Sequence, residues 1–422
     1  MARTLTALLP TLTQGSLVGS ALIVSYGYPL LFGLTVYGQF ATATVLTFIT
    51  QRIVDLIAES TIADRDPFAL VKSSLIVSAC ALALLAAARW LFPAALPAVF
   101  DLRLFLSLAA STVILNLMFQ IGSRVTQFLY AAAFGTLNLV ITLVWYALGR
   151  HDLPLALAII NVMGFAIGAS LLFLEHRRNG YSAAPVERTA NTVMLSRLPY
   201  RVLFAAFQII VAFGVVLIAS WHLPAEQVGA LRLLTTFALM GYSLSPVNPK
   251  MLYAISRTVE GPADLIRVMR PFTPFFAGLL LCWIIAIVAI GWIGMADSNH
   301  LYLYALAVYP IVLFSAVFER VLISRHGIRT VGIIVGLFAA GTAIALLIGH
   351  DMVYYVIVLI ICVATYPLVL AIFVSPKFLP VISIVILLGG VGSLTIGGFL
   401  VAAAGAAGLA AGLSILLPRL SS

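Results

Sequence analysis

The sequence predicts an all-α polytopic membrane protein with 12–14 transmembrane helices. Of its 422 residues, 63% are hydrophobic and only 9% are charged, whereas soluble chains are about 45–50% apolar and about 25% charged. The mean hydropathy is +1.15. Long apolar runs recur along most of the chain, and a run of about 18 residues or more crosses the hydrocarbon core as a helix.

Twelve apolar runs define the predicted helices in order. They lie at about 12–35, 37–60, 68–92, 103–123, 127–148, 154–175, 199–221, 225–247, 271–294, 300–320, 328–348 and 352–374. The longest polar stretch, 176–198, falls at the midpoint. The tail at about 378–417 is apolar and rich in Gly and Ala, and it is long enough for a hairpin of two short helices. The total is therefore 12 or 14.

The lysines and arginines predict the orientation, because cytoplasmic loops carry an excess of these residues. With the N-terminus in the cytoplasm, 18 of the 23 fall on the cytoplasmic side. Only Arg89, Arg103 and Arg150 fall outside, and Arg52 and Arg232 lie within helices. Both termini are therefore expected in the cytoplasm. The net charge of +9 is explained by this asymmetry, so no nucleic-acid partner is expected.

Two similar segments suggest an internal duplication. Each has an apolar helix, a short turn and a second helix that carries an arginine, at 27–59 and 213–245. We expect Gly38 to end the first turn and Gly229 the second, which sets an offset of 191 residues. Six plus six helices entering from the same side predict parallel repeats about an axis along the membrane normal. The expected parts are two six-helix lobes at 1–180 and 181–375 and a helical hairpin or tail at 376–422.

Arg52 is one of two candidate substrate-binding arginines. An ionisable group in a membrane helix costs about 2.5–3.5 kcal/mol on insertion scales, which makes it a functional hypothesis by default. Arg52, Asp55 and Glu59 share one helix face. In one reading Arg52 and Asp55 form a neutralising pair within the helix. In the other the face lines a cavity, Arg52 binds phosphate, and Asp55 and Glu59 are candidates for ion coupling.

Arg232 is the second candidate, and it has no acidic residue three or four positions away. Helix geometry places it roughly 10 Å from the outer end of its helix and Arg52 roughly 20 Å from the outer end of its own. Its long side chain can reach the outer surface, where Glu226 is a partner, or it can face a cavity shared with Arg52. Arginine suits phosphate because its planar fork donates two parallel hydrogen bonds.

Other polar residues inside the predicted helices are weaker candidates for substrate binding. Interhelical hydrogen bonding is their ordinary explanation. They are Gln14, Asn116, Gln120 and Gln208.

Catalytic and metal-binding patterns are missing from the sequence. There is no P-loop, no HExxH, and no Ser, His and Asp set at one membrane depth. The three cysteines lie far apart in apolar segments, and the six histidines show no ligand spacing. No enzyme activity, cofactor or metal site is therefore expected.

The chain resembles the multidrug/oligosaccharidyl-lipid/polysaccharide (MOP) exporter superfamily, and most closely the Wzx-type flippases of O-antigen and other polysaccharides. Helix count, half-length and orientation carry the resemblance over about 10–375, together with the turns LTVYGQFATATVL (34–46) and WHLPAEQVGALRLL (221–234). Such turns in the family read as Pro, an acidic or polar pair, an aromatic or Val, then Gly. The first turn departs from this, with Thr35 and Val36 in place of Pro and Glu.

The resemblance implies two six-helix lobes that open alternately to each side of the bacterial cytoplasmic (inner) membrane. The substrate would be an undecaprenyl-diphosphate-linked oligosaccharide, an O-antigen or exopolysaccharide repeat unit. In the related lipid II flippases, arginines on helices 2 and 8 line the cavity, which matches Arg52 and Arg232. Helix 1 here lacks the basic residues of that branch, which favours the O-antigen branch. H⁺ or Na⁺ would drive transport, membrane lipids would hold the prenyl tail, and polysaccharide polymerase or assembly proteins would be partners.

An alternative from the same superfamily is a MATE-like cation-coupled antiporter of drugs or metabolites. Such a protein would use an acidic cavity for cations, whereas the predicted cavity here is cationic. A membrane-embedded enzyme or a structural partner is a third reading. It is disfavoured because the catalytic set is missing and the outer loops are short.

Overall fold

The protein is an all-α, multi-pass membrane protein. The computed structural model describes chiefly residues 19–61, 100–179, 190–243 and 299–380, with isolated positions between and beyond them, and these residues contain helices and no strand. Within that part of the chain, seven helices are long and apolar enough to cross a membrane. They are Gly15–Phe32, Leu102–Phe119, Arg124–Ala147, Leu153–Arg178, Pro199–Ala219, His326–Leu347 and Met352–Val374.

The chain divides into two compact units. Unit 1 comprises Met1–Ala205 and Phe213–Arg232, and unit 2 comprises Ala206–Ala212 and Leu233–Ser422. The chain therefore leaves unit 1 at Ala205, returns to it at Phe213, and leaves it again after Arg232. The predicted boundary between two six-helix lobes at residue 180 stays a prediction.

In unit 1, the turn between the first two predicted helices lies at Gly33. Helix α2 (Tyr28–Thr61) contains this one residue with non-helical angles, φ 83° and ψ 161°. Only glycine adopts that region without strain, so the chain reverses there. The expectation that Gly38 ends the turn was wrong. Gly38 instead lies inside the second helix, five residues after the break.

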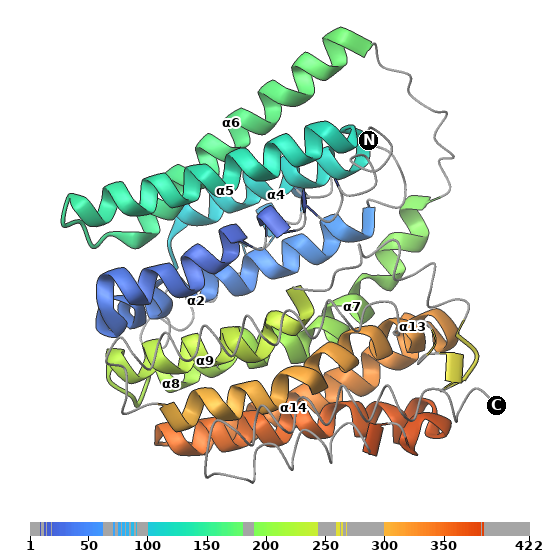
Figure 1. Ribbon diagram of the computed structural model, residues 1–422. Helices are drawn as coiled ribbons and strands as arrows, with labels where there is room; N and C mark the ends of the chain where they lie inside the picture. The colour runs from blue at the N-terminus through green and yellow to red at the C-terminus, as the bar shows by residue number, and fades with distance from the viewer. Residues whose placement is uncertain are drawn as a thin grey trace. The chain divides into compact units, whose positions relative to one another are not determined.

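Three further helices of unit 1 pack side by side: α4 (Leu102–Ile121), α5 (Arg124–Ala147) and α6 (Leu153–Asn179) (Figure 1). The side chain of Asp101 accepts the N–H of Leu104 at 2.9 Å and caps α4. Ser123 caps α5 in the same way, through the N–H of Thr126 at 3.2 Å. These caps satisfy N–H groups that a helix start leaves without partners. Helix α4 therefore starts one residue before its predicted position, and α5 starts three residues before its own.

The first helix contains a π-helical turn, η1 (Ile23–Gly27), directly before α2. The sequence did not suggest this turn. Asn138 of α5 is 1% exposed, and its Nδ2 donates to the backbone oxygen of Ser20 at 3.0 Å and to its Oγ at 2.9 Å. A side chain from a neighbouring helix therefore satisfies a carbonyl group close to the start of the π turn, where the normal helical pattern changes.

The next helix begins earlier than expected. Helix α7 covers Ala190–Ile209, whereas we predicted a polar stretch up to residue 198. It continues through a second π-helical turn, η3 (Ile210–Gly214), into the short α8 (Val215–Ala219). Helix α9 (Ala225–Ser243) follows and starts where the sequence predicted. The expectation that Gly229 ends the preceding turn was wrong, because Gly229 lies inside α9. Both first helices of the proposed repeats thus carry a π turn.

In unit 2, the described helices are α13 (Asn299–Leu347), α14 (Met352–Val374) and the 3₁₀ turn η6 (Pro376–Phe378). Helix α13 is broken at Gly327, with φ 80° and ψ 154°, which is the geometry of Gly33. The break falls between the two helices predicted at 300–320 and 328–348. Helices α13 and α14 lie side by side in Figure 1.

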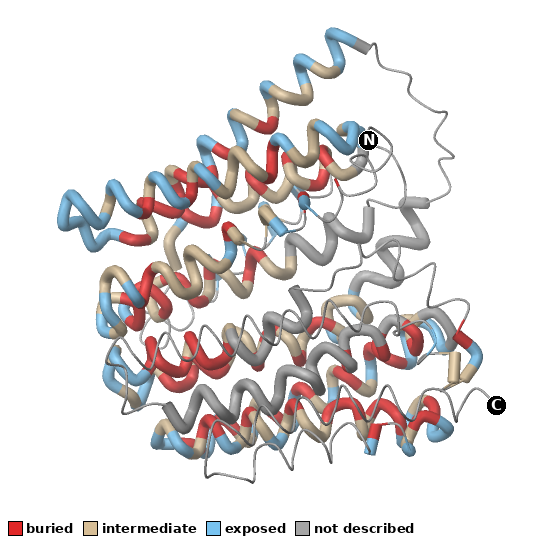
Figure 2. Tube along the Cα trace, in the orientation of Figure 1, coloured by how far each residue is buried: buried red, intermediate tan, exposed pale blue. Residues whose placement is uncertain are grey.

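Burial along α14 follows the helical period and shows how the unit faces lipid. Buried residues recur at Tyr355, Leu359 and Val363, whereas Ile357 and Ile361 are 50% and 55% exposed. Figure 2 shows buried and exposed stretches alternating along this helix. Apolar side chains on both faces are typical of a helix that packs on one side and meets hydrocarbon on the other. The exposed isoleucines therefore fit a membrane-spanning helix.

Three predicted elements lie largely or entirely outside the described residues. They are the helices at 68–92 and 271–294 and the tail hairpin at 378–417.

Candidate functional site

The site in unit 1 is organised by a close crossing of α2 and α9. A Cβ atom on Gly38 would lie 1.7 Å from the carbonyl oxygen of Ala225, and one on Gly229 would lie 2.3 Å from that of Leu34. No side chain fits at these distances, so the two backbones are in direct contact. The crossing holds the start of α9 against the part of α2 that follows Gly33 and fixes the residues beside the glycines.

Arg232 lies one helical turn beyond Gly229 and is half-buried. Its guanidinium carbon sits 4.5 Å from the centroid of the Phe213 ring. Its guanidinium also donates a hydrogen bond to the hydroxyl of Tyr37 in α2, the residue next to Gly38. A cation over an aromatic face is stabilised by about 0.5–2 kcal/mol, depending on its desolvation. The arginine is thus held by one aromatic ring and one phenol.

A row of aromatic side chains continues from this arginine along α2. Phe213 stacks on Phe48 with centroids 5.8 Å apart, and Phe48 meets Phe40 edge to face at 6.2 Å. Phe40 in turn stacks on Tyr37 at 6.1 Å. The row continues the aromatic contact of Arg232 along α2. A guanidinium is planar and carries five N–H donors, a geometry that suits bidentate binding of an anion.

Arg52 lies further along α2 than Tyr37, the residue that bonds Arg232. Both arginines are half-buried in unit 1, and Tyr37 precedes Arg52 by 15 residues on α2. A rise of 1.5 Å per residue separates those two positions by about 22 Å along the helix axis. Phe48, whose ring stacks on Phe213 beneath Arg232, precedes Arg52 by only four residues on α2. The predicted difference in depth between the two arginines stays a prediction.

Asn116, a candidate for substrate binding, belongs to a polar seam between α2 and α4. Its Nδ2 donates to the backbone oxygen of Thr112 at 3.0 Å, within its own helix. The Nε2 of Gln51 donates to the hydroxyl of Thr112 at 2.6 Å and joins the two helices. Asn116 is 7% exposed. The hydrogen bond of Asn116 thus stays within its own helix, and that of Gln51 joins two helices, which is the ordinary role of such amides in membrane helices.

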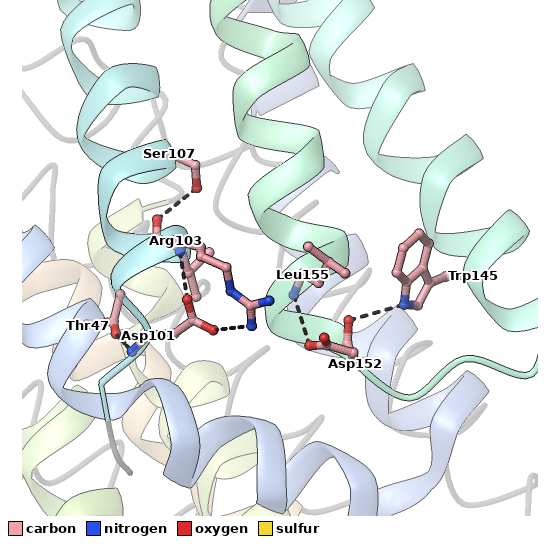
Figure 3. A network of polar contacts seen from close by, with 8 residues as sticks. Thr47, Asp101, Arg103, Ser107, Trp145, Asp152 and Leu155 are labelled. Atoms are coloured by element: carbon pink, nitrogen blue, oxygen red, sulfur yellow. Dashed lines mark hydrogen bonds and ion pairs between the residues drawn. The ribbon is translucent and has the colours of Figure 1, made fainter.

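A second polar network lies at the starts of α4 and α6 (Figure 3). The N–H of Asp101 donates to Thr47 Oγ1 at 2.9 Å, and an Arg103 amino group lies 3.0 Å from the Asp101 carboxylate. The Asp152 carboxylate caps α6 through Leu155, and its backbone oxygen accepts the Trp145 indole N–H at 3.1 Å. Burial alone would raise the pKa of Asp101, but its bonds with Arg103 and the backbone lower it below the ordinary value.

Gln208, the remaining described candidate, lies in unit 2. Its Nε2 donates to Oε2 of Glu319 in α13 at 3.4 Å. Glu319 is 2% exposed. Glu319 was not predicted as a site residue, because it lies near the end of the predicted helix 300–320. The signal available was an acidic residue inside the run VLFSAVFERVLIS.

Four predicted site residues have no described side chain. Asp55 and Glu59 lie within α2 and Gln120 within α4, but only their backbones are described. Gln14 lies outside the described residues. Their proposed roles in ion coupling and substrate binding remain predictions.

The aromatic partners of Arg232 were not predicted. Tyr37, Phe48 and Phe213 stand in apolar helices where aromatic residues are ordinary core residues, so no pattern distinguished them. Within the described residues, no group of three His, Cys, Asp or Glu side chains could hold a metal ion. No family model matches this chain, and neither a curated protein nor a solved structure matches it.

Proposed function

We propose that the protein is a flippase that moves an undecaprenyl-diphosphate-linked oligosaccharide across the bacterial inner membrane by alternating access. The observation that carries the proposal is Arg232, held over Phe213 and beside Tyr37 in a membrane helix. A charged arginine in a membrane helix is energetically costly, so its presence is by default a functional hypothesis. Diphosphate is the ligand class that best matches an always-charged bidentate donor.

Arg52 would supply a second cationic binding position nearer the cytoplasm. It lies on the same helix as Tyr37, about 22 Å further along the axis. A diphosphate that crosses the membrane needs charge compensation at more than one depth, because an isolated anion is not stable in an apolar medium. We propose that Arg52 engages the diphosphate first and Arg232 engages it later, while the prenyl tail stays in lipid.

A MATE-like antiporter of cationic drugs or metabolites is the second candidate. The buried carboxyl of Glu319 in unit 2 favours it, because an acidic group suits a cationic substrate. The two candidates differ in the sign of the charge that the transported molecule carries.

A reconstitution assay separates them. Full-length protein in liposomes would be offered a fluorescent undecaprenyl-diphosphate oligosaccharide and, separately, a cationic dye. The flippase proposal predicts movement of the lipid-linked sugar and not of the dye, with a loss of movement in Arg232→Ala. The matched control is Arg150→Ala, which removes an exposed arginine in the loop before α6. Transport of the dye alone would favour the antiporter.

A further inference from the structure

Two helices of unit 1 bring three exposed arginines to one end of a hairpin. Helices α5 and α6 lie side by side and are joined by a short loop, so the start of α5 lies beside the end of α6. Arg124 is the first residue of α5, and Arg177 and Arg178 stand in the last turn of α6. All three side chains are exposed, and Figure 2 shows exposed residues at this end of α6.

A hydrogen bond between a carboxylate and the backbone fixes this end of the hairpin. Both carboxylate oxygens of Glu175 accept the backbone N–H of Ser123, at 3.0 and 3.2 Å. Ser123 directly precedes Arg124. Glu175 lies just before the pair Arg177 and Arg178. The bond therefore gathers arginines from two helices around one contact, and we call these three arginines the basic cluster.

The basic cluster carries an excess of positive charge. Helices α4, α5 and α6 contain one acidic residue, Glu175, and its oxygens already accept a backbone N–H. Within the part of the chain that the structure describes, none of the three arginines forms an ion pair. A single carboxylate does not neutralise three guanidinium groups, so the cluster attracts anions.

Exposed apolar side chains lie beside the basic cluster on the same helices. Phe173 and Leu174 of α6 are 63% and 59% exposed, and Val125 of α5 is 53% exposed. Apolar residues on the outside of a membrane helix meet hydrocarbon, whereas arginines at its end extend to the level of the headgroups. The end of the hairpin thus combines a surface for acyl chains with donors for a phosphate.

We propose that the basic cluster binds the headgroup of an anionic phospholipid. Its guanidinium groups would donate hydrogen bonds to the phosphate oxygens, and the acyl chains would lie on the exposed apolar side chains next to it. The cluster falls on the predicted cytoplasmic side, where the leaflet is anionic and basic sites between helices hold lipid headgroups. Free phosphate would meet the same arginines but would gain nothing from the apolar surface, which favours the lipid.

This lipid site is independent of the proposed transport function. The excess of basic residues in cytoplasmic loops explains why arginines occur on this side. It does not explain why a carboxylate from α6 is bonded to the start of α5. Loops that carry only diffuse charge attract anionic lipids without a fixed stoichiometry, whereas an anchored cluster predicts binding that saturates.

Native mass spectrometry of the full-length protein in a non-ionic detergent measures this binding. The protein would be titrated with phosphatidylglycerol and, separately, with phosphatidylcholine that has the same acyl chains. We expect saturable and tighter binding of phosphatidylglycerol. A variant that combines Arg124→Gln, Arg177→Gln and Arg178→Gln should lose about a hundredfold in affinity, because each basic residue near an anionic surface contributes roughly fivefold.

Two single variants serve as controls for the triple variant. Arg178→Gln alone should lose about fivefold in affinity, whereas Arg150→Gln, which removes an exposed arginine at the other end of the same hairpin, should change nothing. Glu175→Gln should strengthen the binding of phosphatidylglycerol. It removes a negative charge, while its amide oxygen can still accept the N–H of Ser123.

Three results would overturn the site: equal affinities of the wild type and the triple variant, equal binding of the two lipids, or an equal loss in Arg150→Gln and Arg178→Gln. Inorganic phosphate at matched ionic strength should not displace the lipid. Displacement would show that the arginines bind free phosphate and would overturn the assignment to a lipid. Circular dichroism shows whether each variant is folded. If the triple variant is not, Arg177→Gln combined with Arg178→Gln gives the same test, with an expected loss of about 25-fold.

Discussion

Gly38 and Gly229 occupy equivalent positions in one reciprocal helix contact. A Cβ on Gly38 would meet the carbonyl of Ala225, and a Cβ on Gly229 would meet the carbonyl of Leu34. Ala225 follows Leu34 by the same 191 residues that separate the two glycines. Each glycine thus meets the residue four positions before the other, which is the signature of an isologous, two-fold contact. This reciprocity is what a duplicated helix pair would produce.

The glycine crossing makes a direct prediction for stability. Gly38→Ala should lower the thermal unfolding temperature of the purified protein in detergent, because overpacking of this kind costs about 1–3 kcal/mol and occasionally more. Gly229→Ala should do the same. Gly341→Ala is the matched control, since a Cβ there has no atom within 4 Å, and it should be neutral or stabilising. Equal unfolding temperatures for all three variants would show that the crossing is looser than described.

Asn138 should stabilise the π turn of the first helix. Replacing it by leucine removes both hydrogen bonds to Ser20, and each lost hydrogen bond costs about 0.5–1.5 kcal/mol. Asn161→Leu is the control, because its amide bonds only within its own helix, to Leu157 at 2.7 Å. Thermal unfolding should show a larger loss for Asn138→Leu. A larger loss for the control would contradict the role given to Asn138.

The Asp101 network predicts a dependence of stability on pH. The folded-state pKa of Asp101 lies below its ordinary value of 3.8, so the unfolded state binds the proton more tightly. The stabilisation is fully present above pH 3.8 and is lost as the pH falls through the folded-state value. Asp101→Asn should therefore be less stable than the wild type at neutral pH, and the two should converge on acidification. Chemical unfolding at a series of pH values measures this, and a gap that widens in acid would contradict it.

The helices and their membrane character were predictable from the sequence. Apolar runs located α5, α9 and α14 within about three residues of their observed starts, because length and hydrophobicity alone decide whether a segment spans a bilayer. Length and hydrophobicity did not predict the positions of the turns. Gly33 and Gly38 both follow apolar residues, and the observed backbone angles, not composition, identify Gly33 as the break.

The details of the candidate site depend on contacts between distant residues. Nothing in the local sequence indicates that Tyr37 bonds Arg232 across 195 positions. The offset of 191 pairs Arg232 with Ala41 and Arg52 with Ser243, so neither arginine is repeated in the other half. The proposed duplication would account for the shared helix crossing, whereas the arginines would be departures from it. Such departures are expected where function, rather than packing, selects a residue.

The measurement that tests the central claim most directly is the rate of flipping of a lipid-linked oligosaccharide by Arg232→Ala in liposomes. Loss of a charge-assisted bidentate contact costs about 1.5–3 kcal/mol, so the account predicts a fall of roughly tenfold or more. Arg150→Ala should flip at the wild-type rate, and Arg232→Lys should be only partly active because it keeps the charge and loses the planar fork. A wild-type rate in folded Arg232→Ala would contradict the account.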